Sequence, residues 1–229
     1  LIAAKDNDEG ITGINPNAAI YSIRVLDDNN EAPLSRVIDG IYYAISKKVD
    51  IINMSFGLDS YSESLKKAVD TAEDAGILVI AAAGNTGDNV QYPAAYDNVL
   101  SVGSVDSDAE LAKSSARGDK IDVVAPGELV CTTGQFGDLL VESGTSLAAP
   151  QVAGVASKIM EANPNASYKD VKKAIVNGAN YNKCGYGLLD EEYTVDNYNK
   201  LVMSVKKNNS MTNKTKVETV EDTGGVKGS

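Results

Sequence analysis

The chain has 229 residues, 43% of them hydrophobic, which is enough for one α/β domain with a buried core and excludes an intrinsically disordered protein. Its 21 basic and 32 acidic residues give a net charge of −11, so nucleic acid and anionic membranes are poor partners. No apolar run in the sequence reaches the roughly 18 residues of a membrane-spanning helix, which argues against a membrane partner.

The chain opens with Leu1, and residues 1–4 resemble the end of a helix already under way. We therefore expect the sequence to be part of a longer protein, so its start carries no information about a signal peptide. Residues 5–13, KDNDEGITG, form a polar turn with two glycines. Such turns are usually plain connections, but closely spaced Asp, Asn and Glu oxygens also suit a hard cation.

Segments with strand and helix patterns alternate along the next 170 residues. Strands are expected at residues 19–26, 50–55, 77–83, 99–105 and 121–125. Helices are expected at 34–48, 62–75, from Ser146 onward and at 167–177, where Ser167 and Asp170 form a variant of the capping box. The fold class predicted is α/β, with three α/β/α layers around a mostly parallel central sheet.

Ser146 begins an apolar run with helical spacing that continues through Ile159. The serine therefore lies at or near a helix N-terminus, where free backbone N–H groups and the helix dipole favour a developing anion. Gly144 permits close approach of another backbone, and Pro150 cannot donate to the carbonyl of Ser146, which loosens the first turn. An alternative is that Ser146 only caps a buried helix.

The stretch SGTSLAAPQVAG, residues 143–154, resembles the nucleophile motif of the subtilisin-like serine proteases, or subtilases. The resemblance extends from residue 1 to about residue 190, including the glycine turn GYGLL at 185–189. It implies a serine endopeptidase with Ser146 as nucleophile and a subtilisin-like fold whose N-terminal part is lacking here. Extended peptides or proteins would be its substrates.

The stretch AAAGN, residues 81–85, resembles the oxyanion motif of the same family. This implies that Asn85 donates its side-chain amide to the oxyanion, beside the backbone N–H of Ser146. The alternative is that Asn85 only ends a strand, as asparagine often does in turns. The resemblance also implies that six residues bind the substrate, and Gln91 would make the pocket floor more polar and less deep than glycine would. These residues are Ser55, Phe56, Gly57, Ala83, Gly84 and Gln91.

The first loop resembles part of a calcium site in subtilases. It implies a side-chain oxygen from Asn7 and backbone carbonyls from Lys5, Glu9 and Ile11, with the remaining ligands outside this sequence. No cofactor is expected for the chemistry, and structural calcium belongs to the full-length protein. Asp122 matches a weaker cation ligand in some members, although a solvated carboxylate at a strand end is the simpler interpretation.

The family's catalytic histidine and aspartate precede the serine, so both would lie before Leu1. This chain has no histidine, and Gln151, where many relatives have histidine, is not a base. We therefore expect the 229 residues alone to be nearly inactive and to need the missing N-terminal segment of the same polypeptide. The resemblance implies that the parent is secreted or at the cell surface.

Two other functions remain open. A degenerate subtilase could act as a binding or regulatory scaffold, although the retained Ser146 and Asn85 argue against it. An α/β module for a small ligand or nucleotide would need a glycine-rich phosphate loop after the first strand, which is lacking.

The domain division expected is a catalytic portion over residues 1–203 and a flexible tail or linker over 204–229, where the periodic pattern stops. Cys131 and Cys184 are expected to be unrelated thiols, with a disulfide as the alternative.

Overall fold

The computed structural model describes residues 1–134, 136–181, 185–192, 194, 195 and 198. In this part of the chain the helices are α1 (Leu34–Ser46), α2 (Glu63–Asp74), α3 (Thr145–Ala162) and α4 (Tyr168–Gly178). The strands are β1 (Ile51–Met54), β2 (Leu78–Ala82), β3 (Leu100–Val105), β4 (Val123–Pro126), β5 (Val130–Thr133), β6 (Leu139–Glu142), β7 (Asn180–Tyr181) and β8 (Gly187–Leu188).

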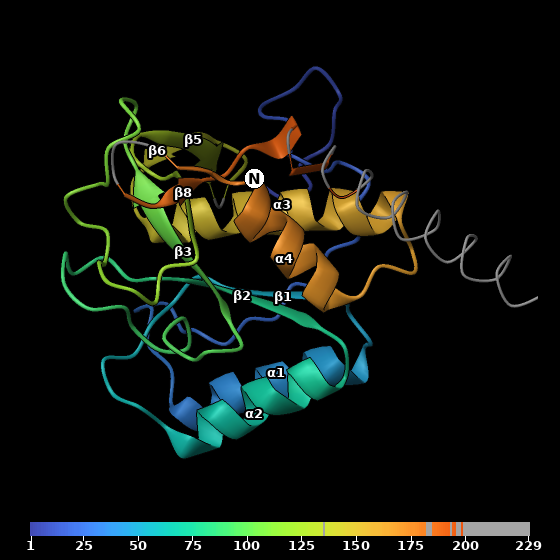
Figure 1. The fold of residues 1–229 in the computed structure, drawn as a ribbon, viewed down its shortest axis with the longest axis vertical. Helices are drawn as coiled ribbons and strands as arrows, with labels where there is room; N and C mark the ends of the chain where they lie inside the picture. Colours follow the sequence, from blue (N-terminus) through green and yellow to red (C-terminus); the bar gives the residue numbers. More distant parts are fainter. Residues whose placement is uncertain (135, 182–184, 193, 196–197, 199–229) are drawn as a thin grey trace, which may run out of the picture.

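Six of the described strands form one sheet in the order β1-β2-β3-β4-β8-β7. The neighbours from β1 to β8 are all parallel, and only the last pair, β7 and β8, is antiparallel. Helices α3 and α4 lie on one side of this sheet and helices α1 and α2 on the other (Figure 1). The α/β class and the three-layer arrangement predicted from the sequence are thereby confirmed.

The central strand β2 is buried along its whole length and serves both layers. Leu78, Ile80 and Ala82 face the core beneath α3 and α4, whereas Val79 and Ala81 face the core beneath α1 and α2. This alternation follows from the two-residue period of a strand. A continuous apolar run is therefore what a strand covered on both faces requires.

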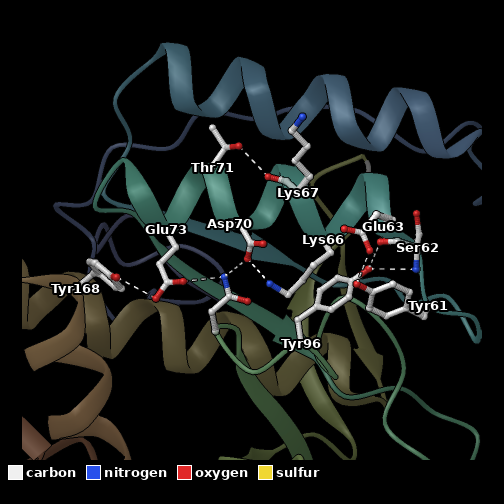
Figure 2. Close-up of polar contacts among 11 residues, drawn as sticks. Tyr61, Ser62, Glu63, Lys66, Lys67, Asp70, Thr71, Glu73, Tyr96 and Tyr168 are labelled. Carbon is white, nitrogen blue, oxygen red and sulfur yellow. Dashed lines mark hydrogen bonds and ion pairs between the residues drawn. The ribbon is translucent and has the colours of Figure 1, made fainter.

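Polar side chains fix the position of α2 against the rest of the molecule. The hydroxyl of Ser62 accepts a hydrogen bond from the N–H of Leu65 and caps the helix. Near the C-terminal end of α2, Glu73 accepts from the hydroxyl of Tyr168 at 2.9 Å and thus joins α2 to α4 (Figure 2). At the start of α4, Ser167 accepts from the N–H of Asp170, as the sequence predicted.

The strand predicted at residues 19–26 is wrong, because the structure has no strand there. Among the described residues, no backbone amide of this segment donates to another backbone carbonyl. The side chains of Ile20 and Tyr21 are more than half exposed. A strand needs a neighbour to complete its hydrogen bonds, and the sequence pattern alone does not provide one.

A cavity of about 860 Å³ separates this extended segment from β1, the edge strand of the sheet. Its lining includes Ile23 and Val25 on one side, Ile51 and Met54 on the other, and Ala153 of α3. The cavity therefore lies between residues 19–25 and β1, and residues of α1 and α3 also line it.

The antiparallel pair of β5 and β6 was not predicted from the sequence. These strands are short and mostly exposed, so they lack the apolar pattern that revealed the central strands. Cys131 lies exposed on β5, whereas its pairing with Cys184 and the expected tail over 204–229 concern residues outside the described ones. None of the described helices is long and apolar enough to cross a membrane.

Candidate active site

Ser146 is the second residue of α3, directly behind the helix start that the sequence predicted. Its hydroxyl donates to the carbonyl of Ser55 at 3.1 Å, and the hydroxyl of Ser55 donates back to the carbonyl of Ser146 at 3.3 Å. Pro150 has no N–H to offer that carbonyl, so the oxygen is available to Ser55. This reciprocal pair ties the nucleophile candidate to the residue that follows β1.

Helix α3 is held in place by its contacts with the central sheet. It packs against β1, β2, β3 and β4, and nine of its 18 residues are buried. Small side chains such as Ala148 and Ala149 let the first turns lie directly on the sheet. The position of Ser146 is thus set by the central core rather than by a surface loop.

Asn85 follows β2 and lies beside the start of α3. Its Oδ1 accepts from the N–H of Thr145 at 2.8 Å and from the Thr145 hydroxyl at 3.0 Å. A backbone N–H can only donate, so the oxygen of the amide faces Thr145 and the Nδ2 group faces outward. Asn85 is exposed, and its N–H groups have no acceptor among the described residues. They can therefore donate to an incoming group.

Gly144 makes the close approach of Asn85 and α3 possible. It has a φ of 144°, and a side-chain carbon added there would lie 3.0 Å from Nδ2 of Asn85. Its N–H donates to the carbonyl of Gly127 at 2.7 Å, which fixes the entry into the helix. Ser146 and Asn85 thus lie on the two sides of the Gly144–Thr145 corner, as the sequence predicted for a shared site.

The arrangement offers two donors and one hydroxyl at the same place. Backbone N–H groups in the first turn of a helix lack intrahelical acceptors, so the N–H of Ser146 is free to donate alongside Asn85. Donors preorganised in this way stabilise the negative charge that develops on a carbonyl oxygen under nucleophilic attack. The site therefore suits acyl transfer.

The residues predicted to bind substrate surround this corner. Ser55, Phe56 and Gly57 directly follow β1, and Ala83 and Gly84 directly follow β2. Neighbouring parallel strands have their carboxyl ends on the same side, so the segments that follow β1 and β2 lie next to each other. The structure brings Gln91 to the same place, because its N–H donates to the carbonyl of Ala83 at 2.9 Å.

The hydroxyl of Ser146 donates to the carbonyl of Ser55, and among the described residues it makes no hydrogen bond to a side chain that could act as a base. Gln151 is turned away from catalysis, since its Nε2 donates to the carbonyls of Pro126 at 2.6 Å and Leu147 at 2.9 Å. With no histidine in the sequence, the described residues hold a candidate nucleophile and candidate oxyanion donors but no imidazole.

The predicted metal ligands lie elsewhere, in the exposed loop near the N-terminus. Asn7 Oδ1 accepts from the N–H of Glu9 at 3.4 Å, and Lys5 and Ile11 flank this turn. The described part of the chain contains no group of three or more His, Cys, Asp or Glu side chains that could hold a metal. The four predicted ligands thus offer one side-chain oxygen and three carbonyls, which is too few for a complete calcium shell.

Asp122 is engaged within the protein. Its Oδ2 accepts from the N–H of Ser101 at 2.9 Å and lies 3.7 Å from the ammonium of Lys172. Close by, the hydrogen bond from Lys120 lowers the pKa of Asp97. Lysine side chains therefore supply the positive charge at this corner of the molecule.

Thr145 is a candidate site residue that the sequence reasoning did not assign. It is buried, it orients the amide of Asn85, and its hydroxyl accepts from the N–H of Gly84 at 3.2 Å. Its place directly before the nucleophile was the available signal. Asp59, which accepts from the side chain of Gln91, had no such signal because it lies in no motif.

Comparison with known proteins agrees with this geometry. The model of the subtilase family, Peptidase_S8, matches residues 1–216. Among curated proteins, subtilisin DY of Bacillus licheniformis is 40% identical over 179 residues, which cover 76% of this chain and 65% of that protein. Subtilisin E of Bacillus subtilis is 40% identical over 185 residues, which cover 79% of this chain and 49% of that protein.

Solved structures show the same likeness. A protease structure from Pseudoalteromonas arctica matches with a TM-score of 0.81 and 31% identity, and covers 86% of this chain and 68% of that one. The prenylagaramide maturation protease PagA matches with a TM-score of 0.70 and 25% identity, and covers 75% of this chain and 70% of that one. This chain spans about half to two thirds of the length of the curated relatives named above. With its nucleophile motif at the start of α3 and its family match over residues 1–216, the chain belongs to the subtilase family of serine proteases.

Proposed function

We propose that the full-length protein is a serine endopeptidase that cleaves peptide bonds through an acyl-enzyme on Ser146, with Asn85 as an oxyanion donor. The observation that carries this proposal is the Thr145 clamp, which turns the amide N–H groups of Asn85 outward beside the nucleophile. The same bond also caps α3, because Gly144 has no side chain and Oδ1 of Asn85 satisfies the N–H of Thr145 in the first turn. The support for the proposal is the direction of the remaining N–H groups, which have no acceptor among the described residues.

In the proposed reaction, Ser146 Oγ leaves the carbonyl of Ser55 and attacks the carbonyl carbon of the scissile bond while a base takes its proton. The carbonyl oxygen becomes negative and accepts from Asn85 Nδ2 and the N–H of Ser146. The C–N bond then breaks, and the leaving amine takes the proton from the base. Water attacks the ester in the same way and restores the hydroxyl of Ser146.

Extended peptide would bind along the segment from Ser55 to Gly57, whose backbone follows β1 without a place in the sheet. An extended ligand can pair with such a segment through main-chain hydrogen bonds. Ala83 and Gly84 would form the facing wall, and Gln91 the floor between the two. This assignment makes the bound carbonyl reach Ser146 and Asn85 together.

The base would come from another part of the polypeptide. That part would occupy the cavity between residues 19–26 and β1. Both sides of this cavity are extended, and β1 has no neighbour on that edge among the described strands. An extended segment parallel to β1 would fill the cavity and end near Phe56, next to Ser55 and the nucleophile. The occupant we propose is a strand of the catalytic domain that the longer relatives possess.

Two further properties follow from the family and remain proposals. The loop with Lys5, Asn7, Glu9 and Ile11 would form part of a calcium site whose other oxygens come from outside the described residues. The protein would act outside the cell or at its surface, as the resemblance implies. Neither property affects the roles of Ser146 and Asn85.

The proposal is tested by replacing Ser146 with alanine in the full-length protein and measuring hydrolysis of a broad peptide library. We expect a loss on the order of 10⁶-fold in turnover, the loss that removal of the nucleophile causes in subtilisin, a member of this family. Ser46→Ala is the matched control, because Ser46 ends α1 and lies before the start of β1, whereas the site follows the end of β1. Equal turnover in the Ser146→Ala variant and the control would refute the proposal.

The 229-residue chain by itself provides a second test with a covalent serine probe such as a sulfonyl fluoride. Without a base, its Ser146 hydroxyl is an ordinary alcohol bonded to a carbonyl, and we expect no labelling. The full-length protein should be labelled at Ser146. A full-length protein that binds peptides but neither cleaves them nor reacts with the probe would instead support a degenerate subtilase acting as a scaffold.

A further inference from the structure

We infer that the side chain of Gln91 fills the space for the substrate side chain that precedes the scissile bond, so that the enzyme cleaves after glycine, alanine or serine. This inference rests on the proposed function. It goes beyond that function by naming the class of substrate that the site accepts and the residues that set it.

The space in question lies between the two segments that follow β1 and β2. Its walls are Gly57 and Gly84, which have no side chains, so the backbones alone would leave a gap between them. Gln91 occupies this gap: a side-chain carbon added at Gly57 would lie 2.6 Å from Oε1 of Gln91, and one added at Gly84 would lie 2.5 Å from the same atom. One side chain thus contacts both walls at once.

Gln91 is held in this place at both ends. Its Nε2 donates to Oδ1 of Asp59 at 2.6 Å, and a carboxylate can only accept, so the amide orientation is determined. Its backbone N–H donates to Ala83, and the next residue, Tyr92, exchanges two backbone hydrogen bonds with Leu58, at 2.7 and 2.9 Å. Gln91 is therefore anchored on both sides of the gap, to Asp59 through its side chain and to Ala83 through its backbone.

Packed tyrosines support the backbone beneath Gln91. The ring of Tyr92 lies 5.6 Å from that of Tyr61 and 4.8 Å from that of Tyr96, measured between centroids. Tyr96 donates its hydroxyl to the carbonyl of Ser62 at 2.7 Å, and Figure 2 shows Tyr61 and Tyr96 together at the start of α2. This cluster leaves little freedom for residue 91 to retreat.

A peptide whose carbonyl reaches Ser146 and Asn85 would direct its preceding side chain toward this gap. A large side chain would have to displace the glutamine amide and break its bond to the Asp59 carboxylate. A hydrogen, methyl or hydroxymethyl group would not. One extra or missing methylene in a hydrophobic pocket already changes kcat/KM by about 10- to 200-fold.

The test compares the wild-type full-length enzyme with Gln91→Gly on matched peptides that differ only in the residue before the scissile bond. The wild type should cleave after alanine about 100-fold more efficiently than after phenylalanine. Gln91→Gly should raise kcat/KM for the phenylalanine peptide about 100-fold relative to the alanine peptide, and so remove the preference for alanine. Asp59→Ala removes the acceptor of the Gln91 amide but leaves Gln91 in the sequence. It should therefore give an intermediate rise in kcat/KM for the phenylalanine peptide.

Asp119→Ala is the matched control for Asp59→Ala, because Asp119 is exposed and lies before β4, whereas the walls of the gap follow β1 and β2. A wild type that already prefers phenylalanine or leucine overturns the inference, as does a Gln91→Gly variant with an unchanged profile. A preference for lysine or arginine also overturns it, because Asp59 would then receive the substrate. In all three cases activity persists, whereas failure of the proposed function would remove activity on every peptide.

Discussion

The two edges of β1 differ in what lies beside them: a paired strand on one edge and a cavity on the other. On one edge, β1 pairs with β2 over four residues, and the ends of both strands carry Ser55 and Asn85 to the start of α3. On the other edge lie a cavity of about 860 Å³ and a segment, 19–26, without backbone hydrogen bonds to other described backbone groups. The first edge is complete, and the second is open.

If the proposed function is correct, its two halves depend on different parts of the polypeptide. The proposed nucleophile and oxyanion donors are positioned by contacts within the described chain, such as the clamp of Thr145 on Asn85. The proposed base would depend on whatever fills the open edge. Substitutions on the complete edge and hydrogen exchange at the open one should therefore separate these two dependences.

Among variants that keep the nucleophile, Asn85→Ala should have the largest effect. In the full-length protein we expect turnover to fall about 10²- to 10³-fold with little change in KM, as loss of the corresponding donor does in subtilisin. Asn177→Ala is the matched control, since Asn177 is exposed on α4. Steady-state kinetics decides the matter, and a change confined to KM would mean that Asn85 binds substrate without stabilising the oxyanion.

Hydrogen exchange should distinguish the open edge from the complete one. In the 229-residue chain, amides of residues 19–26 should exchange almost as fast as in an unstructured peptide, because they lack acceptors. In the full-length protein we expect about 100-fold slower exchange there, equivalent to about 2.7 kcal/mol of opening free energy. Mass spectrometry after peptic digestion measures both. Equal exchange in the two proteins would mean that no strand fills the cavity.

Gly144→Ala should damage the complete edge without removing a catalytic group. Residue 144 has a φ of 144°, and the added methyl would press on Nδ2 of Asn85. Backbone strain of this kind costs about 1–3 kcal/mol, and a displaced oxyanion donor should lower kcat about tenfold or more. Gly76→Ala is the informative control, because its positive φ brings similar strain with no neighbour within 4 Å. It should lower stability but leave kcat unchanged.

Tyr96→Phe should have the smallest effect. Tyr96 is buried, and loss of its hydrogen bond to Ser62 should lower the free energy of unfolding by about 1 kcal/mol, which chemical denaturation measures. Burial raises the pKa of Tyr96 above its ordinary value of 10.0. Because the folded-state pKa is raised, this group's contribution is fully present below pH 10 and is lost as the pH rises through the folded value.

The alkaline loss of stability should therefore be shallower in Tyr96→Phe than in the wild type. Tyr42→Phe is a suitable control, because Tyr42 is 41% exposed. Parallel stability curves for the Tyr96→Phe variant and the wild type between pH 9 and pH 11 would show that Tyr96 does not titrate in this range.

The sequence by itself determined the class of the fold and predicted the two principal candidate site residues. Strand β2 is an unbroken apolar run and α3 an apolar helix behind a Gly-Thr-Ser motif, so both were predictable from local pattern. The positions of Ser146 and Asn85 were predictable for the same reason, since Ser146 lies in the first turn of α3 and Asn85 lies three residues after the end of β2. The caps of α2 and α4 are likewise local, because a serine hydroxyl needs only its own next turn.

Tertiary structure decided what depends on a neighbour distant in sequence. Residues 19–26 have a strand pattern but no ladder, because a strand exists only with its partner. The outward direction of the Asn85 amide depends on Thr145, 60 positions away, and the filled gap between Gly57 and Gly84 depends on Gln91 and Asp59. Hydrogen bonds and steric contacts act through space, so no local pattern in the chain contains them.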